Sequence, residues 1–129
     1  MQQSYIMLCD HNETVTINKI TELLHHYKEI TNKLSKQLNW EYEPRAFPYT
    51  IKISHTDQII LEATSLPYKK IFIELSPKRN QTGHMIQFTL TEESTFADKG
   101  KANELIKIIG KKLKGKIVLF NGRTIRDYM

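Results

Sequence analysis

Glu22, His25 and Glu29 are the residues whose types and spacing best match a metal-binding site. A Glu-x-x-His pair on one helix supplies half of the ligands of a di-iron carboxylate site. The second Glu-x-x-His pair and the two further glutamate-bearing helices of such a site do not occur in this sequence. On a helical wheel the three side chains lie on the polar side, away from the core. We therefore interpret them as exposed helix residues and expect no metal ion or other cofactor.

Cys9 is the only cysteine, and it resembles a thiol nucleophile because Asp10 and His11 follow it directly. A catalytic thiol needs a spatially arranged base and an accessible, electropositive setting. Cys9 instead closes an apolar segment, and free cysteine is among the most buried residue types. The sequence also contains no Gly-x-Ser-x-Gly motif and no glycine-rich phosphate loop. It therefore favours a non-enzymatic protein over an enzyme, and we assign no catalytic residue.

A basic helix face near the C-terminus is a candidate for binding anions. Residues 98–129 contain nine basic and three acidic side chains, whereas residues 1–97 contain ten basic and eleven acidic ones. Lys107, Lys111 and Lys114 lie opposite the apolar stripe of this helix and are expected to be exposed. They could bind nucleic acid or another anionic ligand. The helix lacks aromatic side chains that stack on single-stranded bases, so a solvated face that favours solubility is the preferred interpretation.

An aromatic connector over residues 40–49 is a second candidate for binding. Four aromatic side chains occur within these ten residues: Trp40, Tyr42, Phe47 and Tyr49. Aromatic side chains serve both cores and interfaces. The charged residues interleaved with them could orient a polar ligand: Glu41, Glu43 and Arg45. The connector is thus a candidate for a small-molecule-binding site, an active site or a partner-binding site. The preferred interpretation is a lid over the core or the sheet edge.

Two amphipathic helices and a set of strands must position these residues. Apolar residues recur every three or four positions from Ile20 to Leu38, which predicts a helix with Thr16 or Asn18 at its N-cap. A second helix is predicted over residues 98–114. Gly110 within it indicates a close packing contact, and Gly115 is expected just beyond its end.

The strands are predicted from apolar segments and from alternation of apolar and polar residues. The first five candidates span residues 5–9, 49–54, 58–63, 69–75 and 84–90, and the last spans residues 116–120. Polar, Pro- or Gly-containing connectors separate the middle four, which favours an antiparallel meander. Asn121-Gly122 predicts a two-residue type I′ turn into residues 123–128. The predicted order is β-α-β-β-β-β-α-β.

The outward face of this sheet is less polar than expected. Alternate residues supply the core, but Ile60, Phe72 and Met85 fall on the opposite face. If their strands pair as neighbours, these residues form an apolar patch, which calls for a cover. The aromatic connector could fold back over it, or a second chain could bind there. We favour the second chain and predict a homodimer or partner contact centred on Phe72.

Five segments of the sequence resemble a small family of bacterial proteins. They are residues 26–31 (HYKEIT), 37–43 (QLNWEYE), 46–49 (AFPY), 112–115 (KLKG) and 119–123 (LFNGR). In this order they are similar to the domain-of-unknown-function family eighteen-eighty-five, found in spore-forming Gram-positive bacteria. The resemblance implies an α+β fold in which a curved antiparallel sheet carries helices on one face, similar to the TATA-binding protein half-repeat. It implies no activity and no site residues.

Length and composition limit the remaining classes of protein. The chain has 129 residues, of which 40% are hydrophobic and 26% are charged, which is typical of one globular domain. Its longest apolar run, residues 5–9, is far shorter than the roughly 20 residues that span a bilayer. No secretion signal is recognised at the N-terminus. We expect a single domain over residues 1–129, cytoplasmic and without a membrane partner, whose leading function is a non-enzymatic interaction module.

Overall fold

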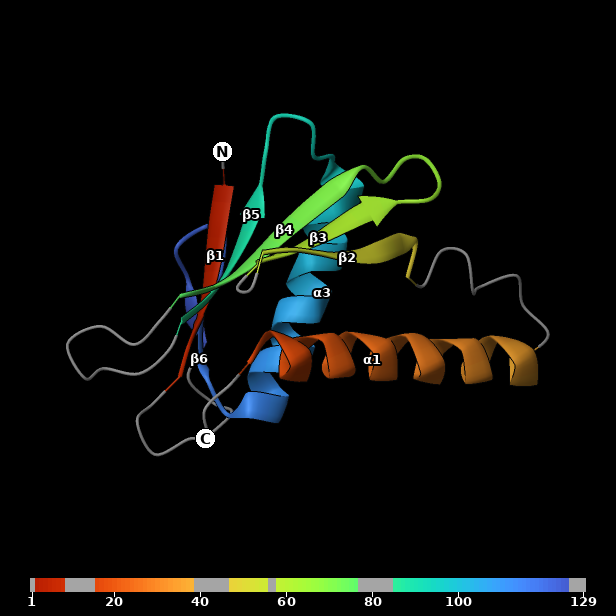
Figure 1. The fold of residues 1–129 in the computed structure, drawn as a ribbon. Coiled ribbons are helices and arrows are strands. Elements are labelled where there is room, and N and C mark those ends of the chain that lie inside the picture. Colours follow the sequence, from red (N-terminus) through yellow and green to blue (C-terminus); the bar gives the residue numbers. More distant parts are fainter. Residues whose placement is uncertain (1, 9–15, 39–46, 56–57, 77–84, 126–129) are drawn as a thin grey trace.

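Over the residues that the structure describes, the protein has an α+β fold with two helices and a seven-stranded sheet (Figure 1). The computed structural model describes residues 2–8, 16–38, 47–55, 58–76 and 85–125. In chain order the elements are β1 (Gln2–Met7), α1 (Ile17–Leu38), β2 (Tyr49–His55), β3 (Gln58–Ala63), β4 (Lys70–Ser76), β5 (Met85–Leu90), α3 (Phe96–Leu113), β6 (Lys116–Val118) and β7 (Thr124–Ile125). The order predicted from sequence lacked the short strand β7.

The sheet is antiparallel throughout, with strand order β2-β3-β4-β5-β1-β6-β7. The predicted meander of β2 to β5 is confirmed. The N-terminal strand β1 then lies between β5 and β6, so the first strand of the chain occupies the interior of the sheet. Its whole length pairs with β5, whereas β6 pairs only with Tyr5, Ile6 and Met7.

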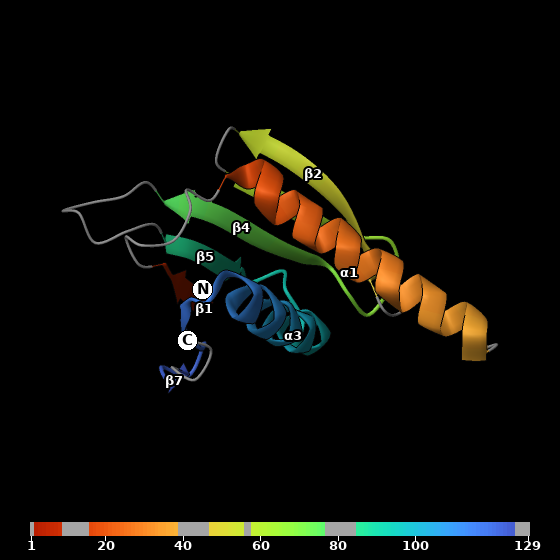
Figure 2. The ribbon, with the colours of Figure 1, turned by 90° about the horizontal axis from the view of Figure 1, so that it is seen from below.

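The core lies between one face of the sheet and the two helices. Alternate residues on the middle strands are fully buried: Ile59, Leu61, Ile71, Ile73, Ile86 and Phe88. Both helices pack against this face, with α1 crossing the β2–β4 side and α3 beside β5 and β1 (Figure 2). The opposite face of the sheet carries neither helix. We call it the open face.

Helix α1 begins at a polar cap and is held to α3 by polar side chains, of which Tyr27 and Lys101 are buried. The backbone N–H of Lys19 donates to Oγ1 of Thr16 at 3.2 Å, so Thr16 serves as the N-cap as predicted. Further along α1, the hydroxyl of Tyr27 donates to Glu104 of α3 at 2.7 Å. The ammonium of Lys101 donates to the same hydroxyl at 3.1 Å. These bonds fix the crossing of the two helices.

Helix α3 begins at a capping box and packs tightly near its C-terminus. Thr95 is the N-cap, and its side chain and that of Asp98 exchange hydrogen bonds with each other's backbone N–H. A Cβ on Gly110 would lie 2.6 Å from Cδ1 of Ile117, which confirms the predicted close contact. The left-handed residue at the end of the helix is Lys114, with φ of 55°. Gly115 instead gives space to Ile6 and Leu8.

The hairpin between β6 and β7 differs from the predicted type I′ turn. Leu119 donates its N–H to the carbonyl of Arg123 at 2.8 Å, and Gly122 donates to Leu119 at 2.9 Å. Three residues therefore form the loop, and among the described non-glycine residues only Lys114 has positive φ. Gly122, with φ of 86°, takes the left-handed position. This is the three-residue loop in which a tight turn is followed by a glycine bulge.

Candidate interaction surface

On the open face, Phe72 lies beside only one of the two apolar residues that were predicted to form a patch with it. Ile60 on β3 lies directly opposite Phe72 on β4, and both side chains are half-buried. On the other side of β4, Phe72 lies opposite Thr89. Met85 lies opposite Ser76, four residues along β5 from Thr89 and roughly 13 Å away at the spacing of a strand. The three residues therefore do not form the contiguous patch expected from sequence.

A second apolar group on the open face was missed in the sequence. Tyr5 of β1 lies opposite Val118 of β6, and both are half-buried. Met7 lies opposite Met85 and is 44% exposed. The apolar run of residues 5–9 places Tyr5 and Met7 on the same face of a strand and so contained part of this signal. This pattern alone did not predict the group, because it does not show that β1 lies between β5 and β6.

Polar side chains between the two apolar groups bond to one another. Gln87 donates its amide to Oγ1 of Thr89 at 3.1 Å. The hydroxyl of Tyr5 donates to Oε1 of Gln3 at 2.8 Å. These bonds run along single strands and satisfy part of the hydrogen-bonding capacity of the open face without a second layer of protein.

The charged residues of the open face are of both signs. Lys52 and Glu62, on neighbouring strands, form an ion pair at 2.6 Å. The hydrogen bond from Lys52, followed by its charge, lowers the pKa of Glu62. The ammonium of Lys70 lies 5.7 Å from the centre of the Phe72 ring, within the range of a cation–π contact.

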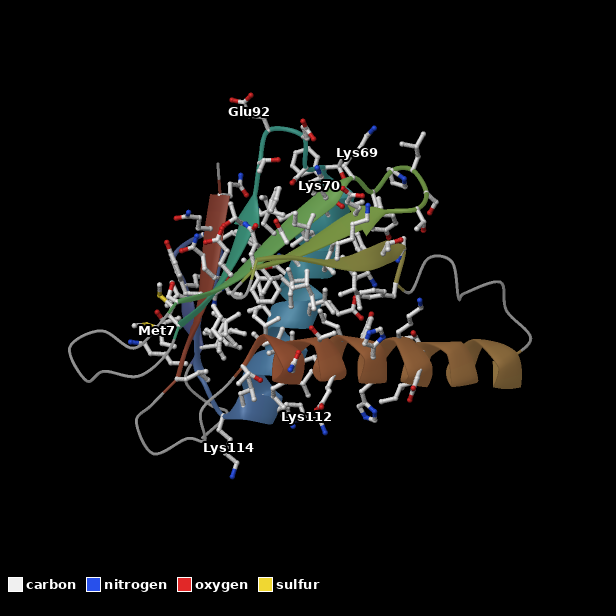
Figure 3. All side chains as sticks on the ribbon, viewed as in Figure 1. Met7, Lys69, Lys70, Glu92, Lys112 and Lys114 are labelled. Carbon is white, nitrogen blue, oxygen red and sulfur yellow. The ribbon has the colours of Figure 1, made fainter. Side chains whose placement is uncertain are left out.

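Two cavities flank the loop between β5 and α3, residues 91–95. One, of about 390 Å³, adjoins Phe72 on the open face and is also lined by Lys70 and Glu92. The other, of about 540 Å³, adjoins the beginning of α3. Figure 3 shows Lys69, Lys70 and Glu92 at this end of the sheet. The loop thus separates two hollows at one end of the molecule.

The described half of the aromatic connector belongs to the core. Phe47 and Tyr49 are 5% and 2% exposed. Their rings are 5.8 Å apart, and the Phe47 ring is 6.0 Å from that of Tyr27. Phe47 and Tyr49 are therefore not available to a ligand. The rest of the predicted site lies outside the described residues: Trp40, Glu41, Tyr42, Glu43 and Arg45.

The hydroxyl of Tyr49 is bound to a buried carboxylate. It donates to Oδ1 of Asp98 at 2.6 Å. Burial, followed by the hydrogen bond to Asp98, raises the pKa of Tyr49 far above its ordinary value. The hydroxyl therefore stays protonated and acts as a fixed donor, not as a base.

The basic face of α3 is exposed as its spacing predicts. Lys107, Lys111 and Lys114 are exposed, and Figure 3 shows Lys112 and Lys114 at the opposite end of the molecule from Lys70. Lysines in the last turn of a helix lie beside its unpaired carbonyl groups and stabilise it. At exposed positions this contribution is small.

The three candidate metal ligands of the sequence lie on the surface of α1. Glu22, His25 and Glu29 are exposed on α1. Across residues 2–8, 16–38, 47–55, 58–76 and 85–125, no three or more His, Cys, Asp or Glu side chains form a group that could hold a metal ion. Over the same ranges no helix is long and apolar enough to cross a membrane. Cys9 and His11 lie outside the described residues.

Comparisons with known proteins identify the family but no activity. A family model described as a domain of unknown function, DUF1885, matches residues 2–128. A crystallised protein of unknown function from Bacillus stearothermophilus is 36% identical, with a TM-score of 0.62 over 89% of this chain and 90% of that chain. No curated protein matches the chain. Because the family model spans nearly the whole sequence, the chain belongs to the DUF1885 family, as its sequence segments implied.

Proposed function

We propose that this protein is a non-catalytic module that binds another protein chain through the open face of its sheet. The observation that carries the proposal is the pairing of apolar side chains on this face. Phe72 lies opposite Ile60, and Tyr5 lies opposite Val118. A sheet with its other face in the core needs only polar residues here. Contact with a partner would remove these apolar pairs from water, which accounts for their presence on this face.

The hydrogen bonds along the open face make it suited to losing its water. Binding removes water from polar groups, and each group that loses a hydrogen bond opposes binding. Gln87 and Thr89 already bond to each other, as do Tyr5 and Gln3. The cost of desolvation is therefore lower than for isolated amide and hydroxyl groups, which supports burial against a partner.

The charge of the open face favours a protein over a nucleic acid as the partner. Nucleic-acid affinity depends on an excess of positive charge that neutralises phosphates. On this face Lys52 is already paired with Glu62, and Lys70 lies on the same strand as Glu74. A likeness to the TATA-binding protein half-repeat would concern the fold and would not itself support DNA binding.

A photo-crosslinking experiment tests the proposal in the full chain. We would replace Phe72 with the photo-reactive residue p-benzoylphenylalanine, produce the chain in its native cells, and irradiate them. We expect a discrete adduct with one protein chain, identified by mass spectrometry. Adding Ile60→Glu should abolish the adduct, because a charge placed beside residue 72 opposes burial of this face.

A matched position separates specific contact from random collision. Ile30 on α1 is 52% exposed and lies outside the open face, so the same photo-reactive residue there should give no discrete adduct. Equal adducts at positions 30 and 72, or none at 72, would contradict the proposal. Circular dichroism of each variant checks that the chain remains folded.

A further inference from the structure

Phe96 is the most exposed of the large hydrophobic side chains that the structure describes, with 93% of its surface accessible. It begins α3 and lines the cavity of about 540 Å³. Leu90, which is 4% exposed, lines the same cavity. A cavity of this size is within the range that holds a small ligand, and it has room for one aromatic ring. A projecting ring and a hollow are thus adjacent on one surface.

The segment that presents Phe96 is fixed by hydrogen bonds. The hydroxyl of Ser94 donates to the carbonyl of Lys70 at 2.8 Å and accepts from the N–H of Thr91 at 3.0 Å. Immediately after it, the capping box of Thr95 and Asp98 fixes the first turn of α3. Phe96 is therefore held in an exposed position and does not contribute its ring to the core.

The charges that line this cavity are one acid and one base. They are Glu92, before α3, and Lys99, in its first turns. Within the part of the chain that the structure describes, neither side chain takes part in an ion pair or a side-chain hydrogen bond. Each is therefore available to a group of opposite charge on another molecule.

We propose that this end of the molecule binds a second copy of the chain about a two-fold axis. The Phe96 ring of each copy enters the cavity of the other, and Lys99 of each copy meets Glu92 of the other. Across a two-fold axis every contact between two different residues occurs twice, once in each direction. Each copy carries the ring, the cavity and both charges. A second copy can therefore bury the ring, fill the cavity and pair both charges. This contact reaches the border of the open face at Glu92, which also lines the cavity beside Phe72, but it uses neither Phe72 nor Ile60.

Sedimentation equilibrium of the full chain tests the role of Phe96. We expect the wild type to form dimers at high micromolar concentration. Phe96→Ala should raise the dissociation constant at least about 30-fold, as for a central aromatic anchor. At concentrations where both proteins are monomeric, the melting temperature should not fall, because the ring is exposed in the monomer. Ile53→Ala, at another exposed apolar side chain, is the matched control and should leave the dissociation constant unchanged.

Charge reversal tests the pairing of Lys99 with Glu92. Lys99→Glu alone gives two acidic contacts, and Glu92→Lys alone gives two basic ones, so each variant should be monomeric. Mixing the two variants restores both opposite-charge contacts in a heterodimer. Its dissociation constant should lie within about threefold of the wild-type value, since only the direction of each pair changes.

Three results would overturn the proposal. One is a wild type that remains monomeric at high micromolar concentration. Another is a mixture of the two charge variants that is no more dimeric than either alone. The third is a dimer that persists in Phe96→Ala but dissociates in Phe72→Glu. That result would assign self-association to the open face and leave the proposed function intact.

Discussion

Asp98 is a buried carboxylate that joins three parts of the chain. It is completely inaccessible and accepts hydrogen bonds from the hydroxyl of Tyr49 and from the backbone N–H groups of Lys69, Lys70 and Thr95. One side chain therefore caps α3, fixes the turn between β3 and β4, and holds the beginning of β2. A buried acceptor with this many donors is costly to remove, because each donor is left without a partner.

We predict that Asp98→Ala lowers the free energy of unfolding by about 3 kcal/mol or more. Urea denaturation measures the loss. Tyr49→Phe removes one donor and keeps the carboxylate, so it should cost about 1 kcal/mol. If Asp98→Ala cost no more than Tyr49→Phe, the carboxylate would not be the centre of this network.

Tyr49 should make stability depend on pH in the alkaline range. Its pKa is raised in the folded state by burial and then by the bond to Asp98. Below about pH 10 both states keep the proton and the contribution is fully present. At higher pH the unfolded state releases the proton first, so stability falls as pH rises.

Urea denaturation at several alkaline pH values tests this dependence. The free energy of unfolding should decrease less steeply above about pH 10 in Tyr49→Phe than in the wild type. Tyr5→Phe, at a half-buried tyrosine of the open face, is the matched control. Identical slopes for the wild type and Tyr49→Phe would show that Tyr49 ionises equally in both states.

At the scale of elements, Gly110 controls how closely α3 approaches the sheet. An added Cβ would lie 2.6 Å and 2.7 Å from two carbons of Ile117, which is itself fully buried. We predict that Gly110→Ala destabilises the protein by about 1–3 kcal/mol, because overpacking exceeds the gain in helix propensity. Gly100→Ala is the matched control: its Cβ would meet nothing within 4 Å, and this variant should be stabilised. Thermal melts of both variants decide the point.

The basic face of α3 should be dispensable for folding. Replacing Lys107, Lys111 and Lys114 together with Gln should change the melting temperature little, because solvated charges contribute little to stability. A drop of many degrees would show that these side chains pack.

Titration of the wild type with an oligonucleotide at two salt concentrations tests whether the basic face of α3 binds anions. Binding that weakens steeply with salt would restore the anion-binding hypothesis.

The elements were largely predictable from sequence, but their partners were not. Alternation fixed the buried face of β3 to β5, and Gly110 in an apolar stripe indicated its close contact. Alternation does not determine which residues lie opposite one another, so Met85 was wrongly grouped with Phe72. The roles of Asp98 and of β1 depend on contacts between distant segments. No local pattern reveals that Phe96 at the beginning of α3 is exposed.

For the whole molecule, the edge of the sheet at β2 is protected against pairing with other chains. Lys52 lies in the middle of this edge strand, and the pairing register shifts between Ile53 and His55. Charges and bulges on edge strands both oppose aggregation. We predict that Lys52→Ile increases light scattering at high protein concentration while leaving the melting temperature nearly unchanged. Lys107→Ile is the matched control, and equal scattering by both variants would contradict protection by the edge.

The interior position of β1 has a consequence for the kinetics of folding. The hydroxyl of Ser4 donates to the carbonyl of Val118, which is 114 residues away, and the whole of β1 pairs with β5. Contacts between residues so far apart in sequence slow folding, because a long loop must close before they form. During synthesis the meander of β2 to β5 can assemble early, but β1 acquires its second neighbour only when β6 has emerged. Strands β6 and β7, which follow β5 in the chain, thus complete the sheet beside β1.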